Sequence, residues 1–513
     1  MLRCWITVLS LCWLMAGTNA PCSAQILRLT DENPRGVAKP GTQPEETVRK
    51  EFRFTAAAEP SPPLRYQFWV VPVRREPGNA VAHLLRANVM LSNVSNLQQL
   101  QRDWQKTYEA VEELPLSKFP TKEARTYLEN FRSVLDALRL AERVERIDYD
   151  FRVQELRGLA FFGTLLPEIQ RARDFARLLH VEAKLAIAEG RYDDAIESLR
   201  TGFGLAEIVS KLGSSFIVAK LVAIAIDSMM LDAAQTMMQQ PGAPNLYWAL
   251  ASLPDDMGDM RYALEGEKLA FENSLHRVTQ LPSEPISHEA WQNRIVATVN
   301  DARQLQDSSS PDIDGTHARM IAGILVLTHG DLSKESLRGQ GLSKDALETM
   351  TYSEAAIRAT RERLLKLQSE YYKWSLVPRS EANINELAEQ YLKDQMTHDR
   401  LHPATLLASL LLPAVQAAQA AGDRVLTKRN QLITLEAIRA YAAANDNRLP
   451  ASLEKLQPLP AWKQAGTAKP FEYERISDTE AVLRRAPYWP GRHDQDAEIG
   501  LTIGPGTEKA VSP

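Results

Sequence analysis

The stretch that decides the fold runs from Glu168 to Gly213 and reads EIQRARDFARLLHVEAKLAIAEGRYDDAIESLRTGFGLAEIVSKLG. Apolar side chains recur in it every three or four residues, which predicts one apolar stripe on each of two helices. We expect the first helix to run from about Pro167 to Ala188, and Gly190 to end it. Because only a short turn follows Gly190, the two helices must lie antiparallel. The stripes comprise Ala172, Phe175, Ala176, Leu179, Ala183, Ala186 and Ile187, and then Ala195, Ile196, Leu199, Phe203 and Ala206.

The turn between these helices also carries a family resemblance. The segment 190–196 reads GRYDDAI, with Leu199 one turn later, and resembles the middle of a tetratricopeptide-repeat (TPR) hairpin. The resemblance implies that small Ala195 lets the helices approach closely and that Tyr192 packs against the first helix. We expect a single TPR-like hairpin over residues 168–206, because the repeat does not continue on either side.

The next segment, Phe216 to Met238, is apolar on most of its faces, which predicts a buried helix. Its charged residues argue against a membrane span. Two of them, Lys220 and Asp227, share one helical face, which is either a solvated edge or partner contact, or the place of a functional charge pair. Pro241-Gly242 ends the helix, and Asn245 is expected to cap the next. The candidate structural or binding positions of the whole stretch are Gly190, Tyr192, Ala195, Leu199, Tyr247 and Trp248.

Length and composition bound the fold class. A chain of 513 residues is long enough for two or three domains. Its formal net charge is −5 and it has no long run of Lys or Arg, so no nucleic-acid partner is expected. Glycines are few, whereas Ala, Leu, Glu, Gln and Arg are abundant. These features predict a mainly α protein, with a TPR-like helical-hairpin body and a small C-terminal α+β module.

The first 24 residues have the pattern of a cleaved signal peptide. Arg3 precedes an apolar core from Cys4 to Ala16, and small residues follow at Cys22-Ser23-Ala24. A lipoprotein anchor on Cys22 and an uncleaved anchor are the alternatives. We therefore expect an exported protein of the periplasm or cell envelope. All three cysteines lie in this segment, so the mature chain would have no disulfide, thiolate nucleophile or cysteine metal site.

The remaining chain divides into three parts. Residues 25–64 are polar and rich in Pro, which predicts a largely disordered linker, with a short strand at Phe52 to Thr55. Residues 65–400 form the predicted helical body, in which Arg319 to Leu327 is expected to be a short apolar helix. Residues 401–513 form the predicted α+β module with a loose C-terminal tail.

The module and the whole chain each resemble a known group. Residues 410–418 (LLLPAVQAA), 447–453 (NRLPASL) and 469–473 (KPFEY) resemble the first helix, loop and first strand of pseudopilin-like modules of bacterial secretion and pilus systems. With residues 77–80 (PGNA), 188–192 (AEGRY) and 241–250 (PGAPNLYWAL), the chain resembles a family of uncharacterised exported helical proteins of planctomycete-type bacteria. That resemblance implies an architecture and no particular chemistry.

No motif in the sequence predicts a catalytic, cofactor or metal site. A nucleophile elbow, a Walker loop and a dinucleotide-binding glycine motif are all missing. His398 and His402 have helical metal-ligand spacing, but no acidic third ligand stands at a diagnostic distance. His288-Glu289 is not a zinc-protease motif, because Gln292 occupies the position of its second histidine.

Three hypotheses for function follow. The first is a non-enzymatic exported protein that binds protein partners in the cell envelope or acts as a scaffold there. The second is an envelope-polymer hydrolase that uses carboxylates of the central helices, with Glu265 and Glu267 near Arg261 as candidates. The third makes residues 404–421 a packing or membrane segment of an envelope assembly. We favour a buried helix there and expect no stable membrane span, because two prolines and several Gln interrupt a modest apolar length.

Overall fold

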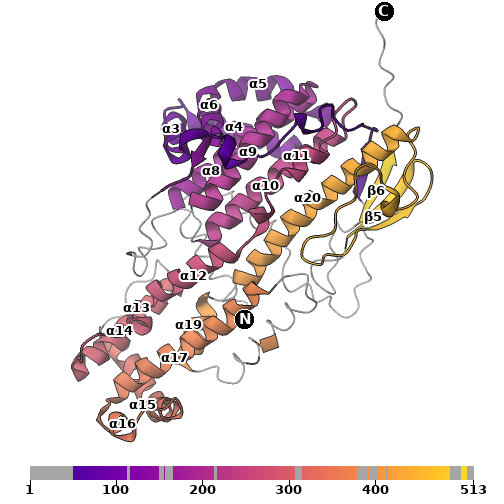
Figure 1. Ribbon diagram of the computed structural model, residues 1–513. Helices are drawn as coiled ribbons and strands as arrows, with labels where there is room; N and C mark the ends of the chain where they lie inside the picture. Colours follow the sequence, from indigo (N-terminus) through magenta and orange to yellow (C-terminus); the bar gives the residue numbers. More distant parts are fainter. Residues whose placement is uncertain are drawn as a thin grey trace, which may run out of the picture.

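The computed structural model describes residues 50–111, 116–149, 155, 166–212, 216–306, 315–377, 390–391, 394, 402–411, 414–485 and 498–504 (Figure 1). The predicted signal peptide, the first part of the predicted linker and His398 lie outside these residues. The described chain is mainly helical, with a small mixed sheet near the C-terminus. This confirms the prediction of a mainly α protein with a small C-terminal α+β part.

The first described helices pack into an apolar layer at one end of the molecule. They are α3 (Ala80–Ser92), α4 (Leu97–Val111), α5 (Thr121–Glu129) and α6 (Arg132–Arg143), accompanied by the parallel pair β2 (Glu76–Asn79) and β3 (Val144–Arg146). The Asn79 side chain caps α3 by accepting a hydrogen bond from the Val81 amide at 3.1 Å. Its amide group also donates to the Asp148 carbonyl at 2.8 Å, so one residue fixes both the helix start and the chain that leaves β3.

The central helices are α8 (Leu166–Ala188), α9 (Tyr192–Leu212) and α10 (Ile217–Met238), and the predicted helix pair corresponds to α8 and α9. Gly190 separates α8 from α9 with a φ of +70°, a conformation that glycine adopts without steric cost. Helix α10 is buried over most of its length, as predicted. It packs against α8 and α9 on one side and against the long helix α20 (Ala414–Ala444) on another.

A second group of helices forms an arm at the opposite end of the molecule (Figure 1). The chain reaches it through α11 (Tyr247–Ala251), the 3-10 helix η5 (Asp255–Gly258), α12 (Arg261–Ser274) and α13 (His276–Thr279). The arm consists of α14 (His288–Gln306), α15 (Gly315–Gly339), α16 (Lys344–Thr349) and α17 (Tyr352–Tyr372). The chain continues into the 3-10 helix η6 (Lys373–Leu376) and later α19 (Pro403–Leu411), which packs on α17. Two small apolar clusters hold the arm together, one around Trp291 and one around Leu337.

The sheet joins the two ends of the described chain. Its strands are β1 (Lys50–Phe54), β4 (Glu472–Arg475), β5 (Glu480–Arg484) and β6 (Glu498–Ile503), in the order β1-β6-β5-β4. Strand β1 runs parallel to β6, with Lys50 opposite Ile499 and Phe54 opposite Ile503. Because side chains alternate along a strand, Phe52 and Phe54 both point into the core. Residues 50–54 were predicted within the linker, so the end of that segment is an edge strand of the C-terminal sheet.

A fully buried ion pair fixes α20 to the body. Glu436 and Arg439 are both 0% exposed, and Arg439 donates two hydrogen bonds of 2.9 Å to the Glu436 carboxylate. The same guanidinium donates to the Thr55 carbonyl after β1 and to the Ala243 carbonyl before α11, each at 3.0 Å. Three segments that lie far apart in the sequence therefore meet at one arginine. Shorter 3-10 helices, η1 (Pro63–Arg65), η2 (Pro72–Arg74), η3 (Leu116–Lys118) and η7 (Leu453–Lys455), connect the elements.

The first turns of α19 pack one face against the protein interior. Ala404, Leu407 and Ala408 are buried, in agreement with the helix predicted there. In the part of the chain that the structure describes, no helix has both the length and the apolar character that a membrane crossing requires.

Candidate functional site

The six sequence-predicted positions hold elements together instead of meeting in one cavity. Ala195 and Leu199 are buried in the central hairpin, and Gly190 forms its turn. The Tyr192 hydroxyl donates to the Pro241 carbonyl at 2.8 Å, which ties the start of α9 to the end of α10. Tyr247 and Trp248 follow as a pair at the start of α11.

The aromatic pair on α11 connects the body to neighbouring segments. The buried Tyr247 hydroxyl donates to the Pro460 carbonyl at 3.0 Å and accepts a hydrogen bond from Trp462 Nε1 at 3.1 Å. Trp248 Nε1 donates to Glu59. These contacts give both residues a structural role between the helical body, the N-terminal segment and the C-terminal module.

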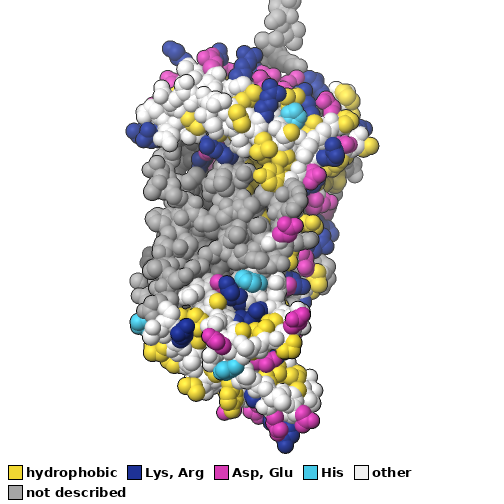
Figure 2. All heavy atoms as spheres, turned by 90° about the vertical axis from the view of Figure 1, so that its left-hand side faces the viewer, with side chains coloured by type: hydrophobic (Ala, Val, Ile, Leu, Met, Phe, Trp, Pro, Cys, Tyr) yellow, Lys and Arg dark blue, Asp and Glu magenta, His cyan; other side chains and the backbone are white. Residues whose placement is uncertain are grey.

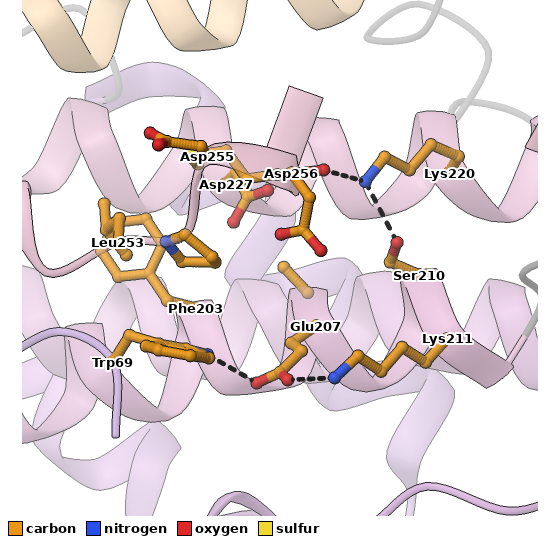
Figure 3. A pocket seen from close by; sticks show the side chains of 13 residues that line it. Trp69, Phe203, Glu207, Ser210, Lys211, Lys220, Asp227, Leu253, Asp255 and Asp256 are labelled. Carbon is orange, nitrogen blue, oxygen red and sulfur yellow. Dashed lines mark hydrogen bonds and ion pairs between the residues drawn. The ribbon is translucent and has the colours of Figure 1, made fainter. Parts of the chain in front are cut away.

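A cavity of about 230 Å³ lies between α9, α10 and η5 (Figure 3). It is lined by Trp69, Phe203, Ala206, Glu207, Ser210, Lys211, Lys220, Asp227, Leu253, Pro254, Asp255, Asp256 and Met257. Both members of the predicted charge pair, Lys220 and Asp227, are in its wall. Their shared helical face, which was open to two interpretations, therefore faces a cavity.

Glu207 is a fully engaged carboxylate on the α9 side of the cavity. Its Oε2 accepts hydrogen bonds from Trp69 Nε1 at 2.9 Å and from the buried guanidinium of Arg75. Its Oε1 accepts one from Lys211 Nζ at 2.6 Å. Burial alone would raise the pKa of Glu207, but the hydrogen bonds and charges of Arg75 and Lys211 lower it overall. Glu207 is thus an ionised group whose charge is already neutralised.

Lys220 places a buried ammonium group at the cavity. The residue is 7% exposed, and its Nζ donates to the Ser210 hydroxyl at 3.2 Å and to the Asp256 carbonyl at 2.9 Å (Figure 3). Burial lowers the pKa of this amine, and the negative charges of Asp227 and nearby aspartates oppose that shift.

Asp227 is the least satisfied group of the cavity. It is only 5% exposed, and within the described chain no donor forms a hydrogen bond to its carboxylate. Burial raises the pKa of Asp227 well above its usual range, with the charges of Asp256 and Glu207 adding to the rise and Lys220 and Arg429 opposing it. A buried carboxyl without a hydrogen-bond donor is stabilised when a donor or a cation binds beside it.

The rim of the cavity is held by α20. Arg429 is buried and donates to the Leu253 and Pro254 carbonyls, both at 3.2 Å, and to Asp255 at 3.0 Å. Behind the rim, Gly258 and Gly422 touch so closely that a Cβ on Gly422 would lie 2.2 Å from the Gly258 carbonyl oxygen. The position of η5, and with it one wall of the cavity, therefore depends on the C-terminal half of the chain.

The two carboxylates considered for a hydrolase do not share this cavity. Glu265 is exposed on α12, whereas Glu267 is half-buried. Burial raises the pKa of Glu267 to about 7, although the hydrogen bond from the Ile217 amide opposes that rise. Neither residue lines the cavity around Lys220, so these two carboxylates and the cavity do not form one site.

No metal centre emerges among the residues that the structure describes. There, no three or more His, Cys, Asp or Glu side chains are arranged to hold a metal ion. Of the two histidines singled out by their spacing, His402 is described and lies edge-on to His329, with their ring centroids 6.0 Å apart. This contact joins α15 to the start of α19.

An exposed apolar face occurs on α15 in the arm. Met320, Ile324 and Leu327 are 56%, 53% and 86% exposed, and their spacing places them on one side of the helix. We call these three residues the apolar stripe. No Asp, Glu, Lys or Arg occurs between Arg319 and Asp331. In Figure 2, hydrophobic side chains lie among charged ones on the surface at the end of the molecule that holds the arm.

The buried face of α15 is built from smaller residues. It consists of Ala318, Ala322, Gly330, Ser333 and Leu337. A Cβ on Gly330 would lie 2.6 Å from the ring of Tyr352, so α17 approaches this face closely. The inward face of α15 is therefore built mainly from small residues, whereas several of its large apolar side chains face solvent, unlike the usual arrangement of an amphipathic helix.

Comparison of the chain with protein-family models, with curated proteins and with solved structures finds no match.

Proposed function

We propose that this protein is an exported, non-enzymatic helical scaffold that binds a protein partner through the apolar stripe of α15. The observation that carries the proposal is the inverted α15, which buries alanine, glycine and serine while Met320, Ile324 and Leu327 face solvent. An exposed apolar patch of this kind marks an interaction surface.

The energetic reason is the cost of leaving large apolar side chains in water. Burying one such side chain fully is worth about 1.5–3 kcal/mol. A rotated α15 would gain that energy within the arm, yet the close packing of Gly330 against Tyr352 holds the small face inward. A partner that covers the stripe supplies the burial that the arm itself does not.

The partner that fits is a protein presenting an apolar helical ridge. The stripe has the four- and three-residue spacing at which side chains of one helix interlock with those of another. Charged residues stand at its ends, with Arg319 before it and Asp331, Lys334 and Glu335 after it. Such an apolar centre with a charged rim is typical of protein–protein interfaces.

The finer parts of the proposal rest on sequence resemblance. The hairpin of α8 and α9 supports a TPR-like body, and the long α20 followed by a small sheet supports a pseudopilin-like module. The apolar segment after Arg3 supports export to the periplasm or cell envelope, and the resemblance to exported helical proteins of planctomycete-type bacteria accords with all three.

The test compares two aspartate substitutions in the full-length chain. Leu327→Asp places a charge in the stripe, whereas Tyr262→Asp changes another exposed apolar position, on α12 outside the arm. Both should leave stability within about 0.5 kcal/mol, because surface substitutions rarely matter more. We expect the partner bound by the unaltered chain in cell-envelope extracts to be lost with Leu327→Asp and kept with Tyr262→Asp. Equal binding by both variants contradicts the proposal.

A further inference from the structure

We propose that the cavity between α9, α10 and η5 is a binding site for a small organic ammonium ion with an apolar body. The proposal is independent of the partner surface on α15, because the cavity lies outside the arm. Three features carry it: a buried carboxylate without a donor, an acidic rim and an apolar wall.

The carboxylate determines the charge of the ligand. Only 5% of Asp227 is exposed, and Figure 3 shows its carboxylate inside the cavity beside Asp256. A carboxylate can only accept hydrogen bonds, so an N–H donor completes it and a cation also neutralises it. An anionic ligand would instead meet Asp227, Asp255 and Asp256 together.

The cationic groups around the cavity are already committed to other partners. Lys211 and Arg75 bind Glu207, and Arg429 binds the loop before η5 and the Asp255 carboxylate. Lys220 donates to Ser210 and to the Asp256 carbonyl. The positive charges are therefore used to build the walls, and the carboxyl of Asp227 is the ionisable group left for a ligand.

The remaining wall selects an apolar body of limited size. It is formed by Trp69, Phe203, Leu253, Pro254 and Met257. A water molecule occupies about 30 Å³ of liquid, so a cavity of about 230 Å³ accommodates a ligand of roughly seven to eight non-hydrogen atoms. A short alkyl or aryl amine has this size and combines one ammonium group with an apolar chain.

Binding should be coupled to the release of a proton. The carboxyl of Asp227 faces Lys220 on its own helix, Glu207 on α9, Asp256 on η5 and Arg429 on α20, and burial raises its pKa. An ammonium ion beside it favours the ionised form, so a proton leaves Asp227 as the ligand enters.

The experiment titrates the full-length protein with n-hexylammonium, n-hexanol and n-hexanoate by calorimetry at neutral pH. We expect n-hexylammonium to bind at least tenfold more tightly than either of the others. Repeating the titration in two buffers of different ionisation enthalpy should reveal the released proton. Tighter binding of n-hexanoate, equal binding of n-hexanol or no binding of n-hexylammonium overturns the proposal.

Two variants locate the site. Asp227→Asn keeps the shape of the side chain and removes the charge, so n-hexylammonium should bind at least tenfold more weakly and proton release should vanish. Asp232→Asn changes an aspartate on the same helix outside the cavity and should bind as the unaltered chain does. The thermal unfolding midpoint of Asp227→Asn should not fall, because a buried carboxyl without a donor has been removed. Undiminished binding by Asp227→Asn overturns the assignment, and the proton measurement on the unaltered chain tests it without any variant.

Discussion

Replacing Arg439 by Met tests the contact that holds the N-terminal strand, the loop before α11 and the C-terminal helix together. The guanidinium is 0% exposed and donates two hydrogen bonds of 2.9 Å to Glu436. It also donates to the carbonyls of Thr55 and Ala243, each at 3.0 Å. Met retains much of the aliphatic volume of Arg, so the loss of stability arises chiefly from the missing charge and hydrogen-bond donors.

The expected loss of stability follows from the ion pair that Glu436 loses. Removing one member of a buried ion pair leaves the other charge without compensation, which costs about 3–5 kcal/mol. Burial already raises the pKa of Glu436, and the charge of Arg439 opposes that rise. Without Arg439, the carboxyl should be protonated in the folded protein at neutral pH, which limits the loss to that range.

The assay is urea unfolding followed by helical circular dichroism, with two further variants for comparison. The double variant Glu436→Gln with Arg439→Met replaces the carboxyl that has lost its partner by a neutral amide, and it should recover about 2 kcal/mol of stability relative to Arg439→Met. Arg448→Met changes an arginine that is exposed and should alter stability by less than about 0.5 kcal/mol. The reasoning is refuted if Arg439→Met unfolds within about 1 kcal/mol of the unaltered chain, below the range for a broken buried pair.

Three further outcomes are expected. In the folded chain Glu267 stays protonated up to a pKa of about 7, whereas its unfolded value is near 4.5, so stability falls as pH rises through that window. Glu267→Gln should therefore stabilise the protein by up to about 3 kcal/mol at pH 8 and not at pH 4, as measured by urea unfolding at both values. Gly422→Ala should lower stability by about 1–3 kcal/mol, because the added Cβ would meet the Gly258 carbonyl. Gly323→Ala on α15, where a Cβ would meet open space, should instead raise stability by about 0.5–1 kcal/mol. Thermal unfolding of both variants measures this difference. Phe52→Ala should cost about 3–5 kcal/mol in the same assay, and a change below about 1 kcal/mol would show that β1 contributes little to the sheet.

Local periodicity was sufficient to predict the central helices. The apolar spacing around Phe175 and Phe203, with Gly190 between, indicates two helices and a tight turn because all three signals are local. The expected helix from Arg319 to Leu327 was too short, since α15 runs from Gly315 to Gly339. Its charged last part stays helical because Ser333 and Leu337 on that part pack inward.

Long-range pairing could not be predicted in the same way. Strand β1 was predicted as a short strand in a linker, but nothing near Phe52 indicates that its partner is β6 at the other end of the chain. The outward face of α15 was equally hidden, because periodicity locates a helix without saying which of its faces the neighbours cover.

The residues that line the cavity could be predicted only in part. The spacing of Lys220 and Asp227 predicted a shared helical face, and this face lines the cavity. Trp69, Glu207 and Asp256 come from three other segments, and no sequence signal brings them together. Their meeting depends on tertiary packing, including the contact between η5 and α20.

The most direct test of the partner surface is photo-cross-linking from single positions in the intact cell envelope. A photoreactive phenylalanine analogue would replace Ile324 in the stripe, or Tyr262 on α12 as the exposed control. The account predicts a discrete adduct with another protein from position 324, absent from position 262 and lost when Leu327→Asp is added. Identical adducts from both positions, no adduct from position 324, or an adduct only with a second copy of the chain would contradict it.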